Sequence, residues 1–494
     1  MARVPKALAR PPLALLAPAA LLAFTSWQFL VRAYFYLRSP FSPDFGEGQV
    51  LALAQEMVKD GTLFGDVQRY PMLLSNYPPV FLLVNAAGFA LFGPSLLLPR
   101  LLSLLAAFAL AAFLFALVRR RTGDAWMASS FALLFFAPWF VQTWAATARI
   151  DVPAQMLSVA GLYAFDRLGS RAGLRRDLPF LLFGLAFYTR QTTLVAPAAV
   201  LASMLLRREQ RRDFPRALAA FALPVLLALG LMTWATQGQA WLHLFPYAAT
   251  AGYDLGHMAR WYGWFLVLVS PLLLVLLAAL ARHPRVLLRG PNLAFALFWA
   301  LSMGGLTTIA KEGAAQNYFI EAYMATLLVA GIALGALVRA GDVPPRAWAA
   351  VPLVALLAIA FSNRGLNWLP QPIRAPRNAR AFAALDEAVR ATTGPILSEN
   401  LSVLVVNRKR VWAEPWGLML LGRKGKWDPS LLAGDCRRQM FDLVVVEWRL
   451  LEIAGLPECF DEEYVRWQDL GPYRLLRPKP RAAPREVVPP GSGR

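Results

Sequence analysis

The sequence predicts a polytopic α-helical membrane protein with about eleven transmembrane helices and a small C-terminal α/β domain. Three observations support this fold class. Hydrophobic residues make up 57% of the 494 residues, charged residues make up 16%, and the mean hydropathy is +0.46. Several apolar runs approach the roughly 20 residues that cross a bilayer. Arginines gather in alternate short loops between these runs, which is the positive-inside pattern.

The net charge of +20 is spread over these short loops. A nucleic-acid-binding protein would instead carry a basic face on a soluble domain. We therefore expect no nucleic-acid partner.

The predicted membrane segments follow one another from the N-terminus to the middle of the chain. They cover residues 13–35, 96–118, 125–145, 152–168, 178–189, 192–206, 218–236, 261–281, 292–310, 320–338 and 347–361. The arginine pattern places the N-terminus in the cytoplasm and the C-terminal region on the exoplasmic side of a cytoplasmic (inner) membrane. Segments 178–189 and 192–206 are short, so two spans meeting at Arg190 and a re-entrant hairpin both remain open.

Three regions are expected along the chain. Residues 1–361 form the transmembrane domain, with a first exoplasmic loop at 36–95, and residues 362–477 form an exoplasmic α/β domain. Residues 478–494 are rich in Pro, Arg and Gly, which predicts a disordered tail. Within the α/β domain we expect a helix at 377–390, strands at 395–398, 442–447 and 474–476, and a turn at Gly471 and Pro472.

The two cysteines, Cys436 and Cys459, both fall in the predicted exoplasmic domain. An oxidising compartment favours a disulfide between them. Two buried free thiols are the alternative.

Two acidic residues follow the first membrane segment, in the stretch Ser42 to Glu47. Asp44 and Glu47 are three residues apart and would share one face of a helix that begins there. A carboxylate is well suited to act as a general base. Asp44 is also a good N-cap, so helix capping is an equal alternative.

Charged residues at membrane depth are functional candidates because they are costly there. Arg149 and Asp151 would stand near the same surface, either as site residues or as an interfacial ion pair. Arg190 needs an anion, which could be a phosphate or one of these carboxylates.

Further candidates lie in two outer loops. Lys311 can bind a phosphate, and Asn317 and Tyr318 can donate hydrogen bonds to a sugar or phosphate; a solvated turn is the alternative. Tyr77 precedes two prolines that fix an extended chain, a signal that favours a structural role. A divalent cation held by Asp44, Glu47 or Asp151 fits by ligand type, but no spacing supports it.

The order of these motifs resembles the GT-C superfamily of membrane glycosyltransferases, in particular the bacterial branch related to aminoarabinose transferase and protein O-mannosyltransferase. The resemblance covers residues 13–335. It is carried by Asp44-Phe-Gly-Glu47, Gly61-Thr-Leu-Phe64, Asn76-Tyr-Pro-Pro79, Phe92-Gly-Pro-Ser95 with Arg100, Ala148 to Pro153, Tyr188-Thr-Arg-Gln191, Lys311-Glu-Gly313 and Asn317-Tyr-Phe319.

The resemblance implies a sugar donor that is linked to a polyprenyl phosphate and embedded in the membrane lipid. It also implies that the sugar is transferred with inversion on the outer face of the membrane. The acceptor would be a lipid, a glycan or a protein. By the same resemblance, Asp44 is the base, Asp151 is a second acidic residue, and Arg190 and Lys311 hold the donor phosphate. Tyr77 and Arg190 stand where related transferases often have lysine.

Two other functions compete with this one. A lipid or small-anion transporter would favour inverted repeats and polar sites at the membrane midplane, whereas the polar candidates here gather near one face. A non-catalytic assembly subunit would tolerate the loss of Asp44.

Overall fold

The computed structural model describes residues 16–42, 44–168, 174–344, 347–362 and 376–480. The chain divides into two compact units. The membrane unit comprises residues 1–64 and 75–375, and the C-terminal unit comprises residues 65–74 and 376–494. Most of the predicted tail, from residue 481 on, lies outside the described residues.

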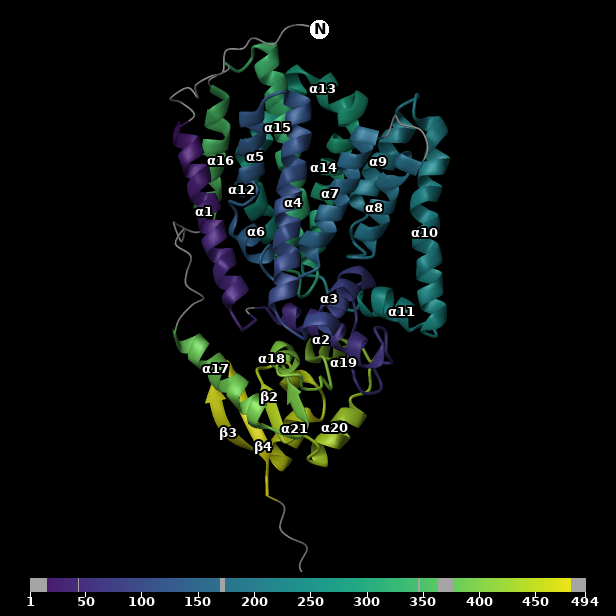
Figure 1. Ribbon diagram of the computed structural model, residues 1–494, viewed down its shortest axis with the longest axis vertical. Helices are drawn as coiled ribbons and strands as arrows, with labels where there is room; N and C mark the ends of the chain where they lie inside the picture. The colour runs from purple at the N-terminus through teal and green to yellow at the C-terminus, as the bar shows by residue number, and fades with distance from the viewer. Residues whose placement is uncertain (1–15, 43, 169–173, 345–346, 363–375, 481–494) are drawn as a thin grey trace, which may run out of the picture. The chain divides into compact units, whose positions relative to one another are not determined.

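The membrane unit is helical throughout, and its long helices run side by side (Figure 1). Its helices are α1 (Leu16–Arg38), α2 (Phe45–Asp60), α3 (Pro79–Phe92), α4 (Leu97–Thr122), α5 (Ala125–Leu134), α6 (Trp139–Trp144), α7 (Asp151–Leu168), α8 (Leu178–Phe187), α9 (Val195–Leu206), α10 (Phe214–Ala235), α11 (Gln239–Leu242), α12 (Leu255–Arg282), α13 (Pro284–Leu288), α14 (Leu293–Gly305), α15 (Phe319–Ala340) and α16 (Ala350–Ser362). Short 3-10 turns, among them η7 (Gln316–Tyr318), connect several of them.

Five helical stretches among the described residues are long and apolar enough to cross a membrane, and five shorter apolar helices accompany them. The protein is thus a multi-pass membrane protein, while the count of eleven crossings stays a prediction. Helix α15 forms the centre of the bundle, because 94% of an apolar 18-residue stretch of this helix is buried. Helix α10 stands at the edge, where Trp234 is 81% exposed and available to lipid.

The structure differs from the predicted segments in two places. The stretch 125–145 is not one helix, because Pro138 cannot donate a backbone hydrogen bond and disfavours helix at the residue before it. In the expected first loop, a helix near Asp44 was anticipated and forms as α2, whereas the apolar helix α3 was not predicted. Segments 178–189 and 192–206 form two short helices, α8 and α9, and Arg190 lies in the turn between them.

The C-terminal unit contains a four-stranded mixed sheet in the order β1-β2-β4-β3. Strand β1 (Ile396–Ser398) runs parallel to β2 (Leu443–Val446), and the pairs β2–β4 and β3–β4 are antiparallel. The three predicted strands are confirmed as β1, β2 and β4 (Tyr473–Pro478), whereas β3 (Tyr464–Leu470) was not predicted. The helices are α17 (Pro376–Ala391), α18 (Leu401–Val406), α19 (Pro415–Arg423), α20 (Ser430–Arg437) and α21 (Leu456–Glu463).

A disulfide and a set of backbone hydrogen bonds connect distant parts of this unit. A disulfide joins Cys436 in α20 to Cys459 in α21. Residues 65–74, although they come from the first loop, pair with the C-terminal part of the chain. Met72 donates its N–H to the Trp412 carbonyl (2.8 Å) and accepts a hydrogen bond from the Glu414 N–H (2.9 Å).

Candidate active site

Asp44 stands immediately before α2, with an extended backbone. Although it occupies the N-cap position, its side chain makes no capping hydrogen bond. The carboxylate instead pairs with Arg149, at 3.1 Å between Oδ2 and Nη1, and the side chain remains 27% exposed. Burial raises the pKa of Asp44, and the positive charge of Arg149 partly opposes this shift.

Arg149 lies directly against the first turn of α2. A Cβ atom on Gly46 would stand 1.3 Å from Nη1 of Arg149 and 3.0 Å from Oδ2 of Asp44. Only glycine therefore leaves room for the guanidinium at this position. Residue types alone gave no reason to single out Gly46.

Asp151, the first residue of α7, joins two arginines. Its carboxylate is 3.5 Å from Nε of Arg149 and 3.0 Å from Nη1 of Arg190, and its side chain is only 2% exposed. Asn317 in η7 donates a hydrogen bond to the same carboxylate at 2.7 Å. Asp44, Arg149, Asp151 and Arg190 thus form a chain of alternating charges, drawn from three separate parts of the sequence.

Aromatic rings line this chain of charges. The Arg149 guanidinium carbon lies 5.3 Å from the Trp144 ring centre and 5.9 Å from that of Tyr77, and Arg190 lies 4.8 Å from the Tyr318 ring centre. Such contacts favour a cation held away from water. Burial raises the pKa of Tyr77 to about 12, so its hydroxyl keeps its proton. Trp144 was missed in the sequence, where its only signal was an aromatic residue near the end of an apolar segment.

Glu47 points away from these groups. Its carboxylate accepts two hydrogen bonds from Arg100, at 2.9 and 2.8 Å, and both side chains are fully buried. It also accepts from the Ala148 N–H at 2.6 Å and from the Ser42 hydroxyl at 2.8 Å. The remaining donors of Arg100 reach the carbonyls of Tyr36, Ser39 and Phe41. Glu47 therefore joins the first loop to the segment that carries Arg149.

Lys311 lies beside the Arg190 end of the chain of charges. Its ammonium donates a hydrogen bond to the Ala248 carbonyl, and its backbone pairs with Tyr253. Burial lowers the pKa of Lys311, and the charge of Arg190 lowers it further. Two neighbouring cations repel each other unless an anion lies near both. A bound phosphate would relieve this repulsion.

The acidic residues do not gather as a metal site. Among the described residues, no three His, Cys, Asp or Glu side chains are grouped closely enough to hold a metal ion. Asp44 and Asp151 both face Arg149, and Glu47 faces Arg100.

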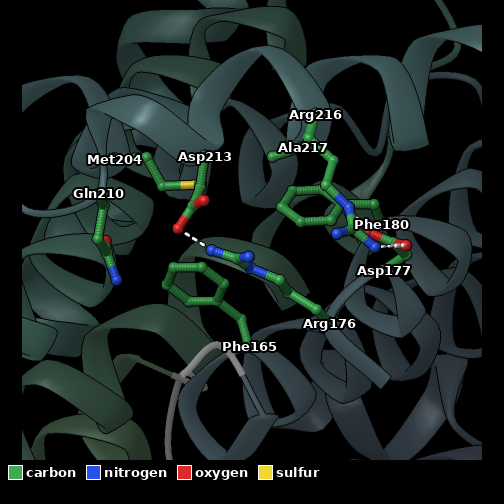
Figure 2. A pocket seen from close by; sticks show the side chains of 9 residues that line it. All are labelled: Phe165, Arg176, Asp177, Phe180, Met204, Gln210, Asp213, Arg216 and Ala217. Atoms are coloured by element: carbon green, nitrogen blue, oxygen red, sulfur yellow. Dashed lines mark hydrogen bonds and ion pairs between the residues drawn. The ribbon is translucent and has the colours of Figure 1, made fainter. Parts of the chain in front are cut away.

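A small cavity lined by both charged and apolar side chains lies about 20 Å from Asp151, near the other end of α7 (Figure 2). Two ion pairs line it, Arg176 with Asp213 and Arg216 with Asp177. They connect the loop before α8 to the start of the peripheral helix α10. The cavity is separate from the candidate site, and these pairs hold the edge of the bundle together.

Several solved structures share this fold. The crystal structure of ArnT from Cupriavidus metallidurans in the apo state matches 93% of this chain and 98% of its own, with a TM-score of 0.63 and 13% identity. The same protein bound to undecaprenyl phosphate matches equally, with a TM-score of 0.62. The archaeal oligosaccharyltransferase AglB from Archaeoglobus fulgidus, in complex with an inhibitory peptide and a dolichol-phosphate, matches 91% of this chain and 74% of its own, with a TM-score of 0.52 and 12% identity.

The chain therefore shares the fold of these multi-pass proteins, and its candidate site is a chain of paired carboxylates and guanidinium groups. Residues 76–235, about a third of the chain, match the family described as dolichyl-phosphate-mannose-protein mannosyltransferase. No curated protein matches the sequence.

Proposed function

We propose that Asp44 is the general base for transfer of a sugar from a polyprenyl-phosphate donor to an acceptor hydroxyl. The acceptor oxygen attacks the anomeric carbon, and its proton passes to the Asp44 carboxylate. The bond between the anomeric carbon and the phosphate oxygen breaks, and its electron pair leaves with the polyprenyl phosphate. Phosphate is a stable leaving group, so the step needs a base more than a strong acid.

One observation carries this assignment. Of the three candidate carboxylates, Glu47 is fully buried and Asp151 is 2% exposed, whereas Asp44 is 27% exposed. An acceptor can therefore reach Asp44. Glu47 and Asp151 are positioning residues, because their oxygens are occupied by arginines and, in Glu47, also by a backbone N–H.

Arg190 and Lys311 are proposed to bind the donor phosphate, with Tyr77, Asn317 and Tyr318 lining the same site. Their mutual proximity supports this role, since Arg190 already lowers the pKa of Lys311. The acceptor class stays open between a lipid, a glycan and a protein.

The reaction is proposed to take place on the exoplasmic face of the cytoplasmic membrane, with the N-terminus in the cytoplasm. Two features support this orientation. Arginine-rich turns, such as Arg119–Arg121 at the end of α4, lie at helix ends away from the candidate site. The disulfide between Cys436 and Cys459 suits an oxidising compartment for the C-terminal unit.

The test is sugar transfer by the purified protein from radiolabelled polyprenyl-phosphate sugars. We expect Asp44→Asn to lower the transfer rate by at least about 100-fold, the lower end for a lost general base. Asp60→Asn, at the exposed far end of the same helix, is the matched control and should keep full activity. Full activity in Asp44→Asn would overturn the assignment and direct attention to Asp151. No transfer by the wild-type protein from any donor would instead favour a transporter or a non-catalytic assembly subunit.

A further inference from the structure

Arg149 occupies the point on which two carboxylates of the site converge. Its Nη1 is 3.1 Å from Oδ2 of Asp44, and its Nε is 3.5 Å from Oδ2 of Asp151. The residue is also fixed at its backbone, since its N–H donates to the Thr147 carbonyl (2.8 Å) and its carbonyl accepts from the Ser103 hydroxyl (3.2 Å). The guanidinium is therefore held in place by its surroundings and does not depend on a ligand.

Two converging carboxylates would otherwise attract a hard divalent cation. Mg²⁺ is commonly held by one or two carboxylates together with substrate phosphates. Without a cation between them, two neighbouring carboxylates would repel each other, which disfavours the ionised form of one of them. A guanidinium avoids this repulsion permanently, because it neither dissociates nor loses its proton in the physiological range.

We propose that Arg149 performs the electrostatic role of a divalent cation in this site, so that sugar transfer needs no added metal. Arg190 and Asn317 contact Oδ1 of Asp151, whereas Oδ2 faces Arg149. It follows that removing the Arg149 side chain leaves Oδ2 of Asp151 and the Asp44 carboxylate to form a divalent-cation site. This inference rests on the proposed function of Asp44. Gly46 belongs to the same arrangement, since it leaves the space that the guanidinium fills.

The first test measures Mn²⁺ binding by electron paramagnetic resonance and needs no substrate. Wild-type protein should bind no Mn²⁺ at this site, while Arg149→Ala should bind one ion in the roughly millimolar range of weak oxygen-ligand sites. Adding Asp44→Asn to Arg149→Ala should abolish that binding. A folded Arg149→Ala protein that binds no Mn²⁺, or whose binding survives the second substitution, would overturn the inference.

The second test uses only the wild-type enzyme and so remains decisive if the variants fail to fold. Transfer should change by less than about twofold when EDTA removes divalent cations, because the fixed guanidinium already supplies the charge. Loss of activity in EDTA, with recovery on adding Mn²⁺ or Mg²⁺, would overturn the inference while leaving Asp44 as the base. Full activity of Asp44→Asn would instead refute the proposed function itself.

Discussion

A substitution in the buried pair of Glu47 and Arg100 can distinguish a catalytic role of Glu47 from a structural one. In Glu47→Gln the acid becomes a neutral amide, and Arg100 is left as a buried charge with three backbone carbonyls and no carboxylate. Breaking a buried ion pair by changing one partner costs about 3–5 kcal/mol. At about 2 °C per kcal/mol, the lower end for large domains, the Tm should fall by about 6–10 °C.

The assay is thermal unfolding in detergent, followed by tryptophan fluorescence, alongside sugar transfer. Glu47→Gln should lose stability and activity together, whereas Asp44→Asn should lose activity with its Tm nearly unchanged. The matched control is Glu209→Gln, which removes a surface pair with Arg207 and should leave the Tm almost unchanged. A Glu47→Gln protein as stable as wild type but inactive would refute the reasoning, because it would assign Glu47 a chemical role.

Three further outcomes are expected. Burial raises the pKa of Asp44, and a carboxylate acts as a base only when it is ionised. The transfer rate should therefore fall as the pH decreases, with an apparent pKa above the ordinary aspartate value of about 3.9. An apparent pKa at or below that value in the pH–rate profile would contradict the assignment. Gly46→Ala should displace the Arg149 guanidinium and lower transfer by roughly 100-fold without unfolding the protein, whereas Gly230→Ala, which meets no neighbour, should be neutral in the same assay. Replacing both disulfide cysteines by serine should destabilise the C-terminal unit by about 3 kcal/mol, given the 23-residue separation, and unchanged resistance to limited proteolysis would argue against this.

The sequence was sufficient to predict the helical membrane fold, because long apolar runs and loop arginines are local signals. Helix α3 was missed because its 14 residues are too few for a span and begin at the second of two consecutive prolines. Strand β3 was missed because five consecutive exposed residues at a sheet edge give no alternating pattern.

The residue types of the candidate site could be predicted from the sequence. Which carboxylate pairs with which arginine could not. Asp44 and Arg149 are 105 residues apart, and Glu47 and Arg100 are 53 apart. No local pattern encodes such contacts, so the sequence could not distinguish an exposed Asp44 from an enclosed Glu47. It also gave no signal for Gly46, whose role appears only once Arg149 is placed against α2.

Residues 65–74 make the C-terminal unit discontinuous in the chain, and this has a consequence for biosynthesis. Met72 finds its partners only when Trp412 and Glu414 have been made. At about 5–20 residues per second, the ribosome needs roughly 20–70 s to reach them. The early segment must therefore remain unpaired while most of the membrane helices are inserted, and truncation of the chain at residue 375 would leave it permanently without its partners.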